Sequence, residues 1–424
     1  MAKKQLCAID IGSNKICAVI ANIEDISKIT VMGAATQASS GIKKGVVVDI
    51  DEASESISSC LKSAERMAGT TVSRAIISIS GSHISSVNYK GIIGISRDEI
   101  TSEDIARATD SAKSVAVPLN KDILQTFPRE FIIDSQGGIK DPIGMSGMRL
   151  EVDTHIISGS SSTIKNIEKC LDEVSVKVDE IFFAGWAGSE VCVNSTEREL
   201  GALYLDIGGG TTDICIYQDD SIYFSASVDF GGNNITSDLA IGLRISIADA
   251  ERVKCDVMQL IKNAQVRKLK NSQDENNPEY NNSDELIFDL SDLGINGTTT
   301  KEFFDEIVDA RIEEIIESIK KIIIDADIEF KFPAGVILSG GSSKLAGIAE
   351  YVGKYIDAPI RVATPPMLYG LSDEINSPNF SAVNGMISYY AKRGGISSKE
   401  STKRGGTSNN FINKLKSLLG NITT

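Results

Sequence analysis

The sequence predicts an α/β protein in which two similar domains enclose a nucleotide cleft. One motif occurs twice, since residues 6–20 read LCAIDIGSNKICAVI and residues 203–217 read LYLDIGGGTTDICIY. Each copy is an apolar stretch, then Asp-Ile-Gly, a small polar turn and a second apolar stretch, which is typical of a β-hairpin. Their wide separation indicates two domains, because solenoid repeats are much shorter. Further along, VILSGGSSK at 336–344 predicts a strand that ends in paired glycines and opens a helix.

The remaining patterns predict the other elements in chain order. Strands are expected at 30–35, 46–49, 75–80 and 91–95. Helices are expected at 51–68, 102–115, 162–174, 233–240, 246–254, 301–325 and 382–392. The Gly-rich segment 131–147 is expected to be a loop between strands, and the polar segment 271–284 a mobile surface loop.

The charge is unevenly distributed along the 424 residues, which carry 43 basic and 58 acidic side chains and a net charge of -15. Residues 389–424 hold seven basic residues and one acid, a charge of +6, which leaves -21 for the rest. Nucleic-acid binding depends on clustered Lys and Arg, so the acidic body is not expected to bind nucleic acid. The basic residues 389–424 are expected to have a different role from that of the acidic body.

Composition excludes several other classes. A hydrophobic content of 42% is enough to bury a core in more than one domain. The sequence has no run of roughly 20 apolar residues, and its first apolar stretch is too short for a signal peptide. Seven scattered cysteines without a CxxC pair suggest reduced thiols that pack as small hydrophobes. Two histidines, His83 and His155, exclude an imidazole-rich metal site and are expected to be structural.

The repeated motif suits a bound triphosphate. Small turn residues allow backbone N–H groups to approach phosphate oxygens, and Mg²⁺ prefers oxygen ligands while retaining water. We expect Asp10 and Asp206 to hold a hydrated Mg²⁺ and to form the catalytic pair, and Lys15 to neutralise phosphate charge. The second turn would wrap the phosphates with Gly208, Gly209, Gly210, Thr211 and Thr212. Either turn alone is more often structural, but both together with Gly340-Gly341 favour nucleotide binding.

These motifs resemble the actin/Hsp70/sugar-kinase superfamily, in which the two hairpins are the phosphate loops and residues 336–348 the adenosine motif. Within it, the chain is most similar to the FtsA family of bacterial actin-like division proteins, on segments 130–150, 178–201, 230–243, 246–254 and 335–352. The resemblance implies ATP as the nucleotide. It assigns to the nucleotide site Gly12, Ser13, Asn14, Lys15, Glu251, Lys254, Gly340, Gly341, Ser342 and Lys344. Glu251 and Lys254 would line adenine and ribose, although an ordinary helix-surface pair is the alternative.

The resemblance also implies a division into subdomains. Subdomain 1A would comprise 1–84, 160–196 and 380–392, with 85–159 inserted as subdomain 1C. Subdomain 2A would comprise 197–236 and 311–379, with 237–310 as subdomain 2B. Residues 393–409 have the composition of a flexible linker, followed by an amphipathic helix at 410–424.

Hydrolysis is expected to be slow. Hydrolytic relatives position the attacking water with a Gln or Glu on the segment that connects the domains. Here that position falls near Ala184, which has no side chain for the task, and Glu190 lies further along. We therefore expect tight ATP·Mg²⁺ binding with weak turnover at most. Trp186 in the same segment is expected to pack in the core.

The C-terminal segment predicts a membrane-surface helix. At 100° per residue its apolar side chains fall on one arc, flanked by two lysines whose stems can reach headgroups. The residues concerned are Phe411, Ile412, Lys414, Leu415, Lys416, Leu418, Leu419 and Ile422. A helix this short lies on a bilayer without spanning it. The alternative is a helix docked on its own domain or on another subunit.

The function implied is that of an ATP-binding division protein that polymerises and anchors the FtsZ ring and other division proteins to the cytoplasmic face of the membrane at the septum. The expected partners are the FtsZ C-terminal tail, which would bind at 237–310 and Arg311, further copies of the chain, and anionic lipid. A sugar kinase or exopolyphosphatase would need a general base that we do not find in a suitable motif. A pilus-assembly adaptor should lack the amphipathic tail, and an Hsp70-type chaperone should carry a substrate domain after residue 395.

Overall fold

The computed structural model describes residues 4–25, 28–271, 285–366, 368–370 and 373–393. The first domain is built on a sheet with the order β11-β6-β1-β2-β3-β19. Its strands are β1 (Lys4–Ile11), β2 (Lys15–Asp25), β3 (Lys28–Ala38), β6 (Arg74–Ile79), β11 (Lys177–Phe183) and β19 (Tyr369–Gly370). β1, β2 and β3 form an antiparallel meander, while β6 and β11 continue the sheet in parallel.

The sheet of the second domain repeats this topology. Its order is β14-β13-β12-β17-β18, from strands β12 (Ala202–Ile207), β13 (Thr212–Gln218), β14 (Ser221–Val228), β17 (Gly335–Ser339) and β18 (Ile360–Val362). Again three strands form an antiparallel meander and two follow in parallel. The repeated sequence motif therefore marks two domains with one topology, as predicted, and both hairpins lie at corresponding places.

The first domain is covered by α1 (Ile50–Ala68), α3 (Ser161–Glu173), α4 (Ala184–Cys192) and α11 (Ser381–Lys392), with α5 (Ser195–Leu200) leading into β12. Gly385 allows α11 to pack closely against α4. A Cβ at this position would lie only 1.6 Å from the carbonyl oxygen of Ala187. Trp186 is buried among Phe127, Phe182 and Tyr389, with ring centroids 4.7, 5.9 and 4.8 Å away. The predicted packing role of Trp186 agrees with this position.

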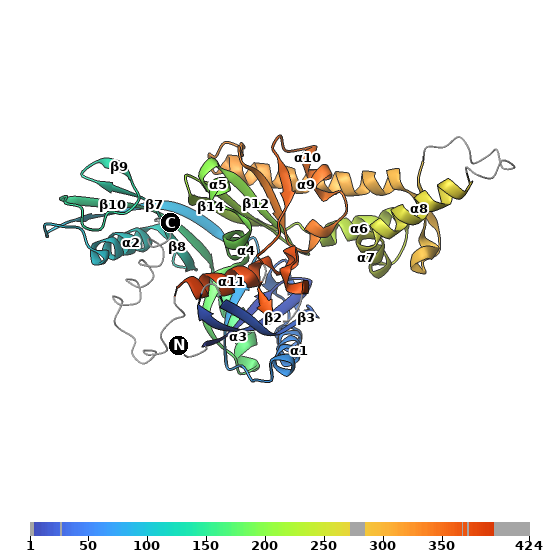
Figure 1. Cartoon of the computed structure of the whole chain (residues 1–424), viewed down its shortest axis with the longest axis horizontal. Helices are drawn as coiled ribbons and strands as arrows, with labels where there is room; N and C mark the ends of the chain where they lie inside the picture. Colours follow the sequence, from blue (N-terminus) through green and yellow to red (C-terminus); the bar gives the residue numbers. More distant parts are fainter. Residues whose placement is uncertain (1–3, 26–27, 272–284, 367, 371–372, 394–424) are drawn as a thin grey trace.

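A second, smaller sheet is inserted into the first domain, and we call it the inserted block. Its strand order is β7-β10-β8-β9, from β7 (Ser85–Gly94), β8 (Lys121–Ile133), β9 (Gln136–Ile139) and β10 (Arg149–Ser160). Helix α2 (Ser102–Ala116) covers one face over its own core around Ile105, Phe131 and Leu150. The block projects at one end of the molecule, at the left in Figure 1.

The second domain extends at the opposite end (Figure 1). This extension contains α6 (Gly232–Leu243), α7 (Ile247–Cys255), α8 (Val257–Asn271), β15 (Ile287–Asp289), β16 (Thr298–Thr300) and the long α9 (Lys301–Asp325). Thr300 caps α9 by accepting from the Phe303 amide, and one face of α9 is buried from Phe304 to Ile323. No helix of the described residues is long and apolar enough to cross a membrane.

The structure corrects several local predictions. Segment 131–147 is only partly a loop, because β8 reaches Ile133 and a turn with left-handed Asp134 and Ser135 leads into β9. The predicted strand 46–49 ends at Val47, since Asp49 caps α1 instead. The paired glycines open a four-residue 3-10 turn, η2 (Gly341–Lys344), and α10 (Ile348–Gly353) follows. Residues 272–284 and the predicted tail helix lie outside the described residues.

Candidate functional site

A cavity of about 600 Å³ lies where both hairpin turns meet the loop after β17. Its lining includes nearly every residue that the sequence assigned to the nucleotide site. These are Asp10, Gly12, Ser13, Asn14, Lys15, Asp206, Gly208, Gly209, Thr211, Glu251, Lys254, Gly340, Gly341, Ser342 and Lys344. Gly210 and Thr212 do not line it. Thr212 instead donates to the carbonyl oxygen of Phe230 at 2.8 Å, which ties the second hairpin to the start of α6.

The two turns are closed by the same kind of backbone hydrogen bond, and they contact each other across the cleft. The Gly12 amide donates to Lys15 O at 3.1 Å, and the Gly208 amide donates to Thr211 O at 2.9 Å. A Cβ at Gly209 would lie 2.4 Å from Asn14 Cγ. Glycine at that position therefore lets the two turns approach across the cleft, which the sequence motif alone does not show.

Asp10 and Asp206 end corresponding strands, and burial raises the pKa of each carboxyl. Asp10 accepts a hydrogen bond from Ser78 Oγ at 2.7 Å, and this bond and the positive charge of Lys15 partly oppose the rise. The pKa of Asp206 is raised further, well above its usual range, because the negative charges of Asp213 and Asp10 add to the effect of burial. The cleft thus holds buried carboxylates with little compensating positive charge.

Asp213 is a site residue that the sequence analysis did not single out. Its Oδ1 accepts hydrogen bonds from Ser80 and, at 2.7 Å, from Ser227, and its carboxyl lines the cavity. Burial raises its pKa to about 7, although the two serine hydrogen bonds act in the opposite direction. The signal was available in the second motif, where this aspartate follows the Gly-Gly-Gly-Thr-Thr turn, but the first motif has Cys17 opposite Asp10 on β2 and no acid there.

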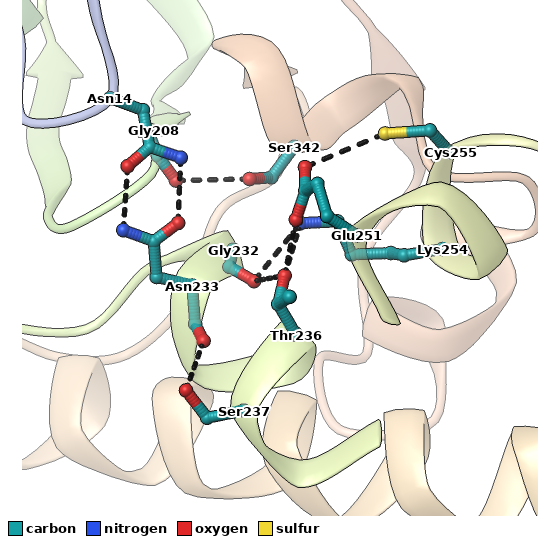
Figure 2. Close-up of polar contacts among 10 residues, drawn as sticks. All are labelled: Asn14, Gly208, Gly232, Asn233, Thr236, Ser237, Glu251, Lys254, Cys255 and Ser342. Atoms are coloured by element: carbon teal, nitrogen blue, oxygen red, sulfur yellow. Dashed lines mark hydrogen bonds and ion pairs between the residues drawn. The ribbon is translucent and has the colours of Figure 1, made fainter. Parts of the chain in front are cut away.

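Lys254 and Glu251 of α7 also line the cavity, and Figure 2 shows the contacts that they make. The Lys254 ammonium donates to Gly232 O at 3.1 Å, to Thr236 Oγ1 at 2.7 Å and to Glu251 Oε2 at 2.7 Å. Burial acts to raise the pKa of Glu251, but hydrogen bonds from Lys254 and Thr236 lower it below its usual range. This pair pins α6 to α7, which is more than an ordinary helix-surface pair.

Cys255 corrects the expectation that all cysteines pack as core hydrophobes. It is exposed and lines the cavity, with Sγ 3.5 Å from Glu251 Oε1, while the other six cysteines are buried. The structural role expected for the histidines agrees with the position of His155, which is fully buried and has a hydrogen-bond partner on both ring nitrogens. The Nε2 of His83 is buried without one among the described residues.

Two contacts cross the mouth of the cleft. The side-chain amides of Asn14 and Asn233 bond to each other reciprocally, each at 2.6 Å, and so join the first turn to α6 (Figure 2). Lys15 Nζ donates to Asn379 O at 2.7 Å and lies 4.3 Å from the ring centre of Phe380. Asn233 and Asn379 were not predicted, because nothing in their local sequence indicates a partner far along the chain.

The segment around Ala184 contributes one residue to the cavity lining. Ala184 lines the cavity, whereas Glu190 does not. The Glu190 carboxylate is bound to Arg198 at 2.9 Å and lies 3.8 Å from Lys392, and despite burial these positive charges lower its pKa. Glu190 is therefore a structural ion-pair partner on α4.

Arg311 lies on α9 and is not among the residues that line the cavity. Its guanidinium makes two hydrogen bonds to Asp238, at 2.5 and 2.9 Å, and a further one to Glu314. Lys301, the other expected member of a basic patch, is paired with Asp305. Both positive charges are therefore offset by carboxylates of the same domain.

Two α/β domains of identical topology that close on a glycine-lined, carboxylate-rich cleft define the actin-like ATPase fold. Solved structures support this fold: the chain is similar to a chain of the PilM-PilN type IV pilus biogenesis complex, with a TM-score of 0.60 and 14% identity over 93% of this chain and 100% of that one. It is also similar to the ethanolamine utilization protein EutJ from Carboxydothermus hydrogenoformans, with a TM-score of 0.50 and 14% identity over 90% of each.

Sequence comparisons identify the family within that class. Residues 203–385 match the family "Cell division protein FtsA", and residues 81–158 match the "SHS2 domain inserted in FTSA". The cell division protein FtsA of Neisseria meningitidis is 32% identical over 91% of this chain and 90% of its own length. That of Borreliella burgdorferi is 32% identical over 92% and 91%, and that of Escherichia coli 27% over 98% of each. The chain belongs to the FtsA family of cell division proteins, which is the expected function class rather than a kinase, pilus adaptor or chaperone.

Proposed function

We propose that this division protein binds ATP with Mg²⁺ in the cleft between its two domains. The observation that carries this proposal is the convergence of both glycine turns and the loop after β17 on one cavity of about 600 Å³. A volume of this size falls within the range of small-molecule and cofactor sites. The turn amides would face phosphate oxygens, and Gly340, Gly341, Ser342 and Lys344 would contact the nucleoside.

The carboxylates fit a hydrated magnesium ion. Burial raises the pKa of Asp10, Asp206 and Asp213, and the negative charge of neighbouring carboxylates adds to the rise at Asp206 and Asp213, so a divalent cation would relieve an unfavourable charge. Among the described residues, no group of three acid, histidine or cysteine side chains lies close enough to hold a metal. We therefore assign Asp10 and Asp206 to the water shell of the ion, which Mg²⁺ retains readily.

Hydrolysis of ATP is proposed to be slow. The connecting segment contributes Ala184 to the cavity, so no side chain of this segment positions a water there. Asp213 is the carboxyl of the cavity best suited to that role, but with a pKa of about 7 it is partly protonated at neutral pH. Turnover well below the range of about 1–100 s⁻¹ typical of kinases is expected.

The FtsZ C-terminal tail is the proposed partner of the extension formed by residues 237–310 and the start of α9. Arg311 remains the residue proposed for the contact, but the structure changes how it would act. An acidic peptide would have to exchange with Asp238 or Glu314 for the guanidinium, since both are bound to it. Arg311→Ala should weaken FtsZ-tail binding, whereas Lys320→Ala on the same helix, whose lysine pairs with Glu317, should not.

The C-terminal segment is proposed to bind the anionic cytoplasmic face of the membrane, and the chain is proposed to polymerise there at the septum with other division proteins. Support comes from the amphipathic pattern of residues 411–422 and from the opposite charges of body and tail. Each basic residue near anionic lipid contributes about 1 kcal/mol, so one tail binds weakly and a polymer gains avidity.

One set of experiments tests these proposals. Binding of a fluorescent ATP analogue should require Mg²⁺ and should be lost in Asp206→Asn, while Gln136→Ala, at an exposed residue of β9 outside the cavity lining, should retain it. Electron microscopy on anionic lipid monolayers should show ATP-dependent filaments with the full chain. A chain that ends at residue 409 should leave the monolayer bare. Nucleotide-independent filaments, or unchanged lipid binding without the tail, would contradict the respective proposal.

A further inference from the structure

The inserted block is docked on the edge of the second domain's sheet. β14 is the edge strand of that sheet, and side chains of β7 occupy its free backbone groups. Ser86 Oγ donates to Ser225 O at 2.7 Å and accepts from the Ser225 amide at 2.9 Å. Asn88 Nδ2 donates to Tyr223 O at 2.9 Å. Hydrogen bonds with Ser86 and Asn88 thus satisfy backbone groups of β14 that, within the described residues, have no neighbouring strand on this side.

His155 of β10 completes the same contact. Its Nδ1 lies 2.6 Å from Asn88 Oδ1 and its Nε2 lies 3.0 Å from Ser225 Oγ. Since the Asn88 nitrogen faces Tyr223 O, its oxygen faces the ring, so Nδ1 carries the proton and Nε2 accepts from Ser225. The ring is fully buried and every polar atom of this group has a partner. We call Ser86, Asn88, His155 and Ser225 the docking network.

The same strand reaches the nucleotide cleft. Two residues beyond Ser225, on the same side of β14, Ser227 Oγ donates to Asp213 Oδ1 at 2.7 Å. Ser80, which immediately precedes the inserted block, donates to the same carboxyl oxygen and lies 2.9 Å from Thr211 Oγ1. Asp213 is therefore held both by the strand on which the block docks and by the segment from which the block emerges.

We propose that β14 couples the cleft to the inserted block, so that occupancy of the cavity that Asp213 lines and docking of the block through Ser86, Asn88, His155 and Ser225 stabilise each other. The partner of the cleft is a Mg²⁺–nucleoside triphosphate, so this part rests on the proposed function. The coupling requires two states, the docked one of this structure and one in which these contacts are broken, and its two sites are the cavity at Asp213 and the docking network. Thermodynamic linkage requires that nucleotide binding change the docking equilibrium by the same factor by which docking changes the affinity for nucleotide.

The first experiment needs no nucleotide. Ser227→Ala removes one hydrogen bond from Asp213 without touching the docking network. Amide hydrogen exchange in β7 and β14 should become at least threefold faster than in the wild type. Ser54→Ala is the matched control, because it removes a hydrogen bond of a buried serine on α1, to Glu173, away from β14. Rates in β7 and β14 that match those of the control would overturn the coupling.

The second experiment measures the reverse direction. Asn88→Ala opens the docking network far from the cavity lining, and the affinity for a fluorescent ATP analogue with Mg²⁺ should fall about fivefold, the lower end of common couplings. Gln136→Ala, an exposed amide on β9 of the same sheet, should change it less than twofold. Equal affinities of these two variants would refute the proposal. If the wild-type chain bound no Mg²⁺–nucleotide, the proposed function would fail, while the exchange experiment would still decide the coupling.

Discussion

The two hairpins share one topology but differ in their electrostatic setting. In the first domain, Asp10 has a hydrogen bond from Ser78 and the nearby charge of Lys15. In the second domain, Asp206 faces the negative charges of Asp213 and Asp10, and its side-chain contact is Tyr204 Oη at 3.3 Å. Besides its burial, the carboxyl of Asp10 thus has only favourable contacts, whereas that of Asp206 faces two like charges that Lys15 offsets only in part. The same fold places two corresponding carboxyls in different electrostatic surroundings.

The largest expected effect follows from replacing the glycine that adjoins Asp206. Gly340 has φ +83°, and an added Cβ would lie 2.4 Å from Asp206 Oδ1 and 2.5 Å from Ile207 O. Gly340→Ala should destabilise the protein by about 3 kcal/mol and weaken Mg²⁺–ATP binding more than 100-fold. Gly341→Ala has no atom within 4 Å of its added Cβ and should keep the stability of the wild type. Urea denaturation and titration with the ATP analogue measure both quantities.

The pH dependence of the ligand-free protein is the next largest effect. The folded-state pKa values of Asp10, Asp206 and Asp213 are raised, to about 7 for Asp213, so the folded protein binds protons more tightly than the unfolded chain. The resulting stability is fully present below the unfolded pKa of about 4 and is lost as pH rises through 7, by at most about 1.4 kcal/mol per group and pH unit. Denaturation between pH 5 and 8 should show this fall. Mg²⁺ with nucleotide should reduce it, and a flat profile without ligand would contradict the assignment.

Neutralising one carboxyl at a time compares the two hairpins directly. At pH 8, Asp206→Asn should stabilise the ligand-free protein by about 1–2 kcal/mol because it removes a buried charge that faces two others. Asp10→Asn should stabilise the protein less, because both substitutions remove an attraction to Lys15 but no neighbouring carboxylate is among the causes that raise the pKa of Asp10. Thermal unfolding with and without Mg²⁺–ATP tests this order, and both variants should lose most of the stabilisation by the ligand. A larger gain in stability for Asp10→Asn than for Asp206→Asn would contradict this prediction.

The smallest effect concerns the amide pair at the cleft mouth. Asn14→Ala and Asn233→Ala each remove an exposed, reciprocal hydrogen-bonded pair that joins the first turn to α6. Each should accelerate release of the ATP analogue about threefold to fivefold, which corresponds to roughly 1 kcal/mol. The double variant should release nucleotide no faster than either single one, because the two residues form one contact. Additive effects would show that the pair does not close the cleft.

Much of the fold followed from local sequence. The 25-residue helix α9 was predicted with its observed bounds, since its apolar spacing and the capping Thr300 are local features. The residues of both turns were assigned to one site because the motif repeats. Helix α8 was not predicted. It has a weak apolar pattern and is held by tertiary contacts with β15 and by the Arg267–Asp292 ion pair.

The sequence by itself determined two domains, a glycine-rich acidic cleft and a basic segment after an acidic body, because hairpin motifs and charge are properties of short stretches. Only the tertiary structure decided which groups share an environment. Asp213 meets Ser80, Asn14 meets Asn233, and His155 docks on β14, in each case across more than 60 positions of the chain. Burial and proximity set the pKa values and contacts of these side chains, and both depend on how distant segments pack.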